Sequence, residues 1–104
     1  MNDLKKEIEM IITELEAIVE MFYQQKTQDA YLKLDSALEK IMTMTGSVQT
    51  YQENYPTKTI NMEDLLNALK ETLEAMEEKD AILVADTLKY EVVEKLNDIA
   101  AQID

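Results

Sequence analysis

Carboxylates, lysines and tyrosines are the side chains in this sequence that could take part in chemistry. The chain has 22 Asp and Glu residues, ten basic residues that are all Lys, and five Tyr, and it has no Cys, His or Arg. The missing types exclude thiolate and imidazole metal sites, a triad base, disulfide bonds and bidentate recognition of phosphate. An enzyme would have to work with carboxylates, Lys and Tyr alone. The composition therefore favours a non-enzymatic protein with no cofactor and no metal.

Asp86 is the carboxylate whose position is least expected. It lies in line with Ile82, Tyr90 and Val93 at helical spacing, where an apolar side chain would suit the packing. A partly buried Asp needs a partner, and Tyr90, one turn later, could donate its hydroxyl. Asp86, with Tyr90, is therefore interpreted as a polar anchor for a bound partner or as an acid with a raised pKa. The alternative is that Asp86 is an ordinary residue at the edge of an apolar stripe.

A second set of candidates consists of apolar and aromatic side chains beside the main apolar seams. Met10, Ala17 and Met21 follow one another at intervals of seven and four and form a narrow ridge. Met serves both as core filler and on adaptable binding surfaces, so the ridge is either packing or a patch for a second copy or a client helix. Tyr51 and Tyr55 lie one turn apart beside a linker, where they could form a ligand-facing rim or close the end of the fold.

Apolar residues recur at intervals of three and four through most of the chain, which is typical of helices that bury one side. The predicted helices span residues 3–23, 28–54, 62–78 and 81–103. Gly46 is placed inside the second helix, because a glycine there costs only about 1 kcal/mol and the apolar spacing continues beyond it. Pro56 ends that helix, since the residue before a proline is displaced from the helical region.

The sequence also predicts how three of the helices begin and which side of the third is buried. Thr27 and Asp80 are expected to cap the second and fourth helices by accepting a backbone hydrogen bond, and Asn61 to start the third. The predicted apolar stripe of the third helix consists of Met62, Leu66, Leu69, Leu73 and Met76, with Leu65 alongside.

Short loops make consecutive helices antiparallel neighbours. The predicted fold is therefore all-α, an up-down-up-down four-helix bundle made of two helical hairpins, in a single domain over residues 1–104. Alternating patterns that would indicate a strand do not occur.

The net charge of −12 bears on the partners and the location of the protein. So many negative charges repel polyanions, so we expect no binding to nucleic acid or to an anionic membrane face. The longest aliphatic run, residues 81–85, is far shorter than the roughly 20 residues that cross a bilayer, and the first residues do not resemble a secretory signal. We expect a cytoplasmic protein.

Residues 77–91, EEKDAILVADTLKYE, resemble a segment of small acidic helical proteins of Gram-positive bacteria that carry no known function. This resemblance implies a bacterial source. The helix–turn–helix plan is also similar to that of bacterial flagellar export chaperones, which cradle a terminal helix of their client. The likeness to the chaperones lies in the helix pattern alone, and neither resemblance identifies functional residues in this chain.

These observations predict a non-enzymatic protein-binding module, an adaptor or chaperone-like protein that recognises an amphipathic partner helix. Met, Leu and Tyr side chains would contact the helix, and the acidic rim would select a basic one. Two alternatives remain open. One is a structural homodimer with no separate client, and the other is an acidic inhibitor of a basic nucleic-acid-binding protein.

Overall fold

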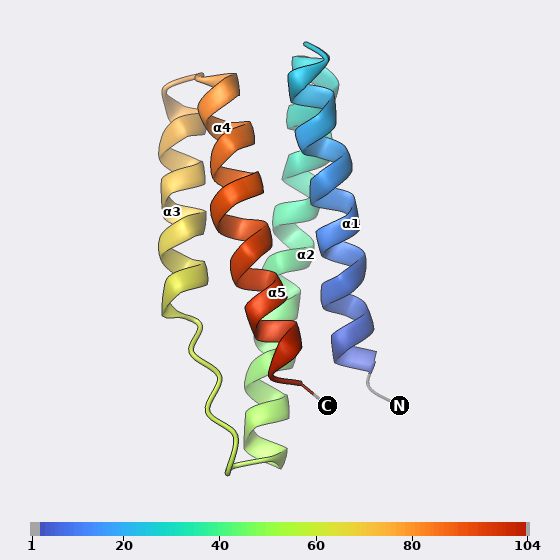
Figure 1. The fold of residues 1–104 in the computed structure, drawn as a ribbon, viewed down its shortest axis with the longest axis vertical. Coiled ribbons are helices and arrows are strands. Elements are labelled where there is room, and N and C mark those ends of the chain that lie inside the picture. Colours follow the sequence, from blue (N-terminus) through green and yellow to red (C-terminus); the bar gives the residue numbers. More distant parts are fainter. Residues whose placement is uncertain (1–2, 104) are drawn as a thin grey trace.

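The structure is a computed structural model that describes residues 3–103, and it confirms an all-α four-helix bundle made of two hairpins (Figure 1). Four helical columns make up most of this described part, which has no strand. The elements are α1 (Asp3–Tyr23), α2 (Thr27–Asn54), α3 (Glu63–Glu77), α4 (Ala81–Thr87), η1 (Leu88–Val92) and α5 (Val93–Ala101). Because α4, η1 and α5 follow one another without a break, they form one column, called here the C-terminal column. The bounds predicted from the sequence differ from these by two residues or fewer.

The first hairpin has regular apolar seams on both helices. The buried side of α2 consists of Ala30, Leu34, Ala37, Ile41, Met44 and Val48, none of which has any exposed surface. The helix passes through Gly46 as predicted, and a Cβ there would meet no atom within 4 Å apart from the adjoining backbone of the helix itself. Burial of Met44 and Val48 on either side offsets the cost of the glycine.

The turn between α1 and α2 shows why Thr27 is not the cap that the sequence predicted. Gln25 adopts a left-handed conformation with φ of 65°, and the Lys26 N–H donates to the Met21 carbonyl over 2.9 Å. This is the Schellman arrangement, in which the chain closes α1 and leaves it again within two residues. The position before α2 therefore falls on Lys26, whose side chain does not cap the helix.

The second hairpin turns in the same way but with a functional cap. Lys79 has φ of 58°, and the Asp80 N–H donates to the Ala75 carbonyl over 3.1 Å. Asp80 precedes α4, and its Oδ1 accepts a hydrogen bond from the Leu83 N–H over 3.1 Å. The predicted cap at Asp80 is confirmed.

The buried side of α3 differs in part from the prediction, since Leu69 and the adjacent Leu65 are buried as expected. Leu66 and Leu73 are 53% and 50% exposed, and the buried residues are Leu65, Ala68, Leu69, Thr72 and Ala75. Short side chains let α3 lie close to the C-terminal column, against which it packs. Thr72 tolerates full burial because its hydroxyl donates to the Ala68 carbonyl over 2.9 Å. The rotation of α3 thus buries the small residues Ala68, Thr72 and Ala75 and leaves Leu66 and Leu73 at the surface.

The connection between the hairpins follows a fixed path below α3 (Figure 1). Ile60 is buried, and both of its backbone groups pair with the side chain of Gln52, the N–H with Oε1 over 3.2 Å and the carbonyl with Nε2 over 3.4 Å. Asn61 Oδ1 accepts from the Glu63 N–H over 2.8 Å, so the predicted role of Asn61 at the start of the third helix is confirmed.

The helices are arranged so that α1 has two neighbours along its length. It packs against α2 on one side and against α4, η1 and α5 on the other. Within residues 3–103, no helix has the combination of length and hydrophobicity that a membrane span requires.

Candidate functional site

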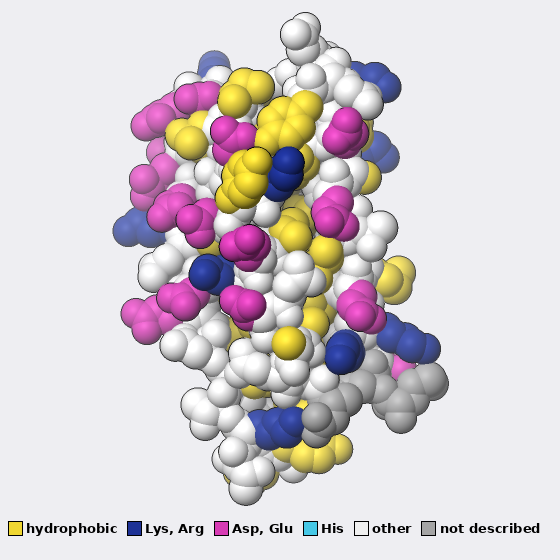
Figure 2. Space-filling model, in the orientation of Figure 1, with side chains coloured by type: hydrophobic (Ala, Val, Ile, Leu, Met, Phe, Trp, Pro, Cys, Tyr) yellow, Lys and Arg dark blue, Asp and Glu magenta, His cyan; other side chains and the backbone are white. Residues whose placement is uncertain are grey.

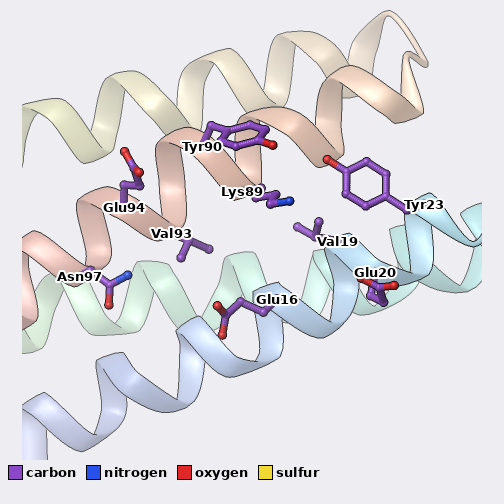
Figure 3. Close-up of a pocket in the computed structure, with 9 residues that line it drawn as sticks. All are labelled: Glu16, Val19, Glu20, Tyr23, Lys89, Tyr90, Val93, Glu94 and Asn97. Carbon is purple, nitrogen blue, oxygen red and sulfur yellow. The ribbon is translucent and has the colours of Figure 1, made fainter.

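A groove with a volume of about 430 Å³ lies between α1 and the C-terminal column (Figure 3). We call it the α1–α5 groove. It is lined by Glu16, Val19, Glu20 and Tyr23 of α1 and by Lys89, Tyr90, Val93, Glu94 and Asn97 of the column. Val19 and Val93 are buried and form an apolar floor, whereas the other lining residues are exposed. On the corresponding face of the surface, acidic side chains border an apolar strip (Figure 2).

The column changes its helical geometry at this groove. Leu88, Val92 and Leu96 are all fully buried and follow one another at two successive intervals of four. In an α-helix with 3.6 residues per turn, two such intervals turn the position by about 80° around the axis, and α1 keeps Ile11, Leu15 and Val19 buried at the same spacing without a π turn. In the C-terminal column, the π-helical turn η1 accommodates an extra residue, and Lys89 and Tyr90 belong to that turn. Single π turns are frequent at functional sites.

Asp86 has a partner on another helix. The hydroxyl of Tyr23 donates to Asp86 Oδ1 over 2.5 Å, and this bond joins α1 to α4 across sixty-three residues of sequence. The sequence indicated Tyr90 as the donor, and the structure supplies this bond from Tyr23. The hydrogen bond to Asp86, together with partial desolvation of the hydroxyl and the negative charge of Asp86, raises the pKa of Tyr23 to about 12.

Lys89 contacts both aromatic rings of the groove. Its Nζ lies 5.7 Å from the centroid of the Tyr23 ring and 5.2 Å from that of the Tyr90 ring, within the range of cation–π attraction. Figure 3 shows Lys89 between the two tyrosines. The groove thus offers an apolar floor, two aromatic walls, and carboxylates at Glu16, Glu20 and Glu94. Chemically, this set can hold an apolar side chain and a cation next to each other.

Residues 1–102 match a family described as a domain of unknown function (DUF8042). The chain belongs to this family. No curated protein and no solved structure matches the chain. Membership of DUF8042 assigns no activity, and the function of this family member is therefore argued from the chemistry of its own groove.

The methionine ridge predicted from the sequence lies elsewhere on this DUF8042 chain. Met10 is 72% exposed, Ala17 is exposed, and Met21 is half-buried against the core. Met10, Glu14 and Met21 share one side of α1, because intervals of four and seven return to the same side of a helix. Glu14 forms an ion pair with Lys40 of α2 over 2.9 Å. That side of α1 therefore lies at the solvent-exposed edge next to α2, away from the α1–α5 groove.

Tyr51 and Tyr55 lie at the end of α2 beside the connection, far from the groove along the bundle (Figure 1). Their ring centroids are 4.7 Å apart at an angle of 34°. Tyr51 is half-buried and packs against the core, and Tyr55 is exposed. Of the seven candidates, Tyr90 lines the groove and Asp86 reaches it through Tyr23.

The sequence analysis missed most of the groove. Glu16, Glu20 and Tyr23 follow one another at intervals of four and three, which does place them on one side of α1. The two successive intervals of four around Val92 do not by themselves indicate the π turn, because α1 has the same spacing at Ile11, Leu15 and Val19 and stays α-helical. Neither pattern says which helix α1 faces. In the described part of the chain, no group of three or more carboxylates is arranged to hold a metal ion.

Proposed function

We propose that this chain is a non-enzymatic protein-binding module that holds one side of a partner's amphipathic helix in the α1–α5 groove. The observation that carries the proposal is the combination of a buried floor, Val19 and Val93, with three carboxylates in the same groove. An amphipathic helix with basic flanks has the complementary pattern, because its apolar anchors fit such a floor and its Lys or Arg residues pair with the rim.

The chemistry of the groove supports binding better than catalysis. General acid–base catalysis is most efficient when the pKa of the catalytic group is near the working pH. Tyr23, with a pKa of about 12, keeps its proton at neutral pH. The chain also lacks Cys and His, the usual nucleophile and base.

A pair of synthetic helical peptides tests the proposal. The first carries Leu anchors with Lys flanks, and the second carries the same anchors with Glu flanks. Binding is followed by chemical-shift changes in the ¹⁵N-labelled protein. We expect the Lys peptide to shift resonances of α1, η1 and α5 around the groove and the Glu peptide to bind far more weakly. Shifts confined to the Met10 ridge or to Tyr51 and Tyr55 would overturn the groove as the site.

A matched pair of variants checks the location. Asn97→Trp fills the groove from an exposed position without removing a buried side chain, and Asn67→Trp places the same ring on an exposed position of α3. We expect only Asn97→Trp to abolish binding of the Lys peptide. Equal binding by the two variants would contradict the proposal.

The same measurements distinguish the alternatives. An acidic inhibitor of a basic protein would bind the Lys-flanked peptide and a peptide without the Leu anchors equally, with a steep dependence on salt. A structural homodimer would sediment as a dimer at every concentration and would bind neither peptide. Either result would replace the proposed function.

A further inference from the structure

The α1–α5 groove already contains a cation that belongs to the protein itself. The Lys89 ammonium lies within 6 Å of the centroids of both the Tyr23 and the Tyr90 ring. A cation in this position is attracted by the negative faces of the rings. Because Lys89 is exposed and its side chain has four rotatable bonds, its head group can move into solvent without any change in the backbone.

The two rings are held where they are by separate parts of the fold. Tyr23 is fixed by its hydrogen bond to Asp86, and Tyr90 projects from the π turn η1. The two rings therefore form a cation site before any partner binds, which lowers the entropic cost of binding a cation there. Lys89 thus occupies a preformed cation site that its side chain can leave.

The charges around the rings favour a further cation. Glu16, Glu20 and Glu94 line the same groove, and Lys89 is the basic residue among its lining side chains. With Asp86 bonded to Tyr23 next to these rings, the local charge stays negative even while Lys89 is present. A Lys or Arg of a partner that replaced the Lys89 ammonium would keep the aromatic contact and leave the carboxylates available to the displaced group.

We propose that the Tyr23–Tyr90 pair is the specificity element of the groove: it takes up one Lys or Arg side chain of the partner helix, and Lys89 is the internal competitor that this side chain displaces. This inference rests on the proposed binding of a partner helix in the groove.

Removal of the competitor tests the inference with the Lys-flanked peptide as the probe. Lys89→Gln is compared with Lys95→Gln, which makes the same change of charge at a position of α5 that lines a different pocket, next to Asp64 of α3. Both variants gain affinity from the more negative surface. We expect Lys89→Gln to gain about threefold to tenfold more affinity for the peptide than Lys95→Gln, because it also removes the cation from the site between the two tyrosine rings.

A double-mutant cycle supplies the second readout. Tyr90→Leu keeps an apolar side chain but removes the ring, and a peptide variant replaces one Lys at a time with norleucine. At one peptide position, we expect norleucine to lower the affinity for the natural protein by about threefold to fivefold. At that position, the same replacement should hardly change the affinity for Tyr90→Leu. Circular dichroism verifies that each variant is folded.

The outcomes separate this inference from the proposed function. If the peptide binds in the groove but Lys89→Gln and Lys95→Gln behave alike, the competitor role is wrong and the proposed function stands. If no peptide position couples to Tyr90, the specificity role is wrong. If no peptide binds in the groove, both proposals are overturned.

Discussion

The two hairpins of this bundle reverse direction with the same backbone turn, yet their second helices begin and continue differently. Gln25 and Lys79 both adopt left-handed conformations, and each turn is closed by a hydrogen bond back to the preceding helix. In the first hairpin the next residue is Lys26, which leaves α2 without a side-chain cap. In the second it is Asp80, which caps α4. Equivalent turns therefore leave the two following helices with different support at their starts.

The two helices also differ in how regular they are, but here the first hairpin has the more regular second helix. α2 contains Gly46, the residue type that most weakens a helix apart from proline, and remains α-helical through it. The C-terminal column has no such residue near its centre and still changes to a π turn at Leu88–Val92. The comparison teaches that a glycine flanked by buried residues does not interrupt α2, and that the C-terminal column changes its helical geometry where no glycine is present.

The largest expected effect comes from deleting one exposed residue in each helix. Deletion of Thr43 would rotate Met44 and Val48 out of the core, and their lost burial predicts a decrease of about 3 to 6 kcal/mol in the free energy of unfolding. Deletion of Glu91, within the π turn, removes the extra residue and leaves intervals of three and four around the buried positions. We expect a much smaller decrease, measured by urea denaturation. Equal losses would break the comparison between the helices.

Alanine substitutions on α3 test which of its leucines contribute to the core. Leu65→Ala removes a fully buried side chain and should lower the free energy of unfolding by about 2 to 5 kcal/mol. Leu66→Ala changes a half-exposed neighbour and should stay within about 0.5 kcal/mol of the natural protein. Thermal denaturation checks both. If Leu66→Ala were the more destabilising variant, the buried side of α3 would instead be the one that includes Leu66 and Leu73.

The difference between the two turns predicts a smaller effect. Asp80→Ala should lower the free energy of unfolding by about 1 kcal/mol, because it removes the acceptor for the Leu83 N–H. Lys26→Asn should raise it by up to about 1 kcal/mol by supplying the missing cap. Lys26→Gln makes the same change of charge without a good capping group and serves as the control in chemical denaturation. If Asn and Gln at this position are equivalent, the missing cap is not what distinguishes the hairpins.

The smallest effect concerns pH and the bond between the hairpins. The pKa of Tyr23 is about 12 in the folded protein against 10.0 ordinarily, so the unfolded state loses this proton first as the pH rises. The contribution of the bond is thus fully present below pH 10 and declines between pH 10 and 12. Tyr23→Phe should show a shallower decline of the free energy of unfolding over that range. Asp86→Asn should return the pKa of Tyr23 towards 10, measured by NMR titration of its ring, and an unchanged value would contradict the assigned cause.

The sequence predicted the helices, their antiparallel order, the passage through Gly46 and the cap at Asp80, because each depends on residues close together in the chain. The buried side of α3 was predicted only in part: Leu69 and the adjacent Leu65 are buried, whereas Leu66 and Leu73 are exposed and the small residues Ala68, Thr72 and Ala75 are buried instead. The α1–α5 groove was mostly missed as well. The bond from Tyr23 to Asp86 depends on how two distant helices are rotated against each other, and periodicity within one helix does not contain that information.

The pairing of Gln52 with Ile60 has a consequence for how the hairpins move. A primary amide that pairs with both the N–H and the carbonyl of one residue makes the same hydrogen bonds as the edge of a neighbouring β-strand. The connection between the hairpins is therefore fixed to α2 at Ile60. The Ile60 amide should therefore exchange with deuterium slowly for a residue outside the helices. Replacing Gln52 with Leu should release that protection and let one hairpin rock against the other.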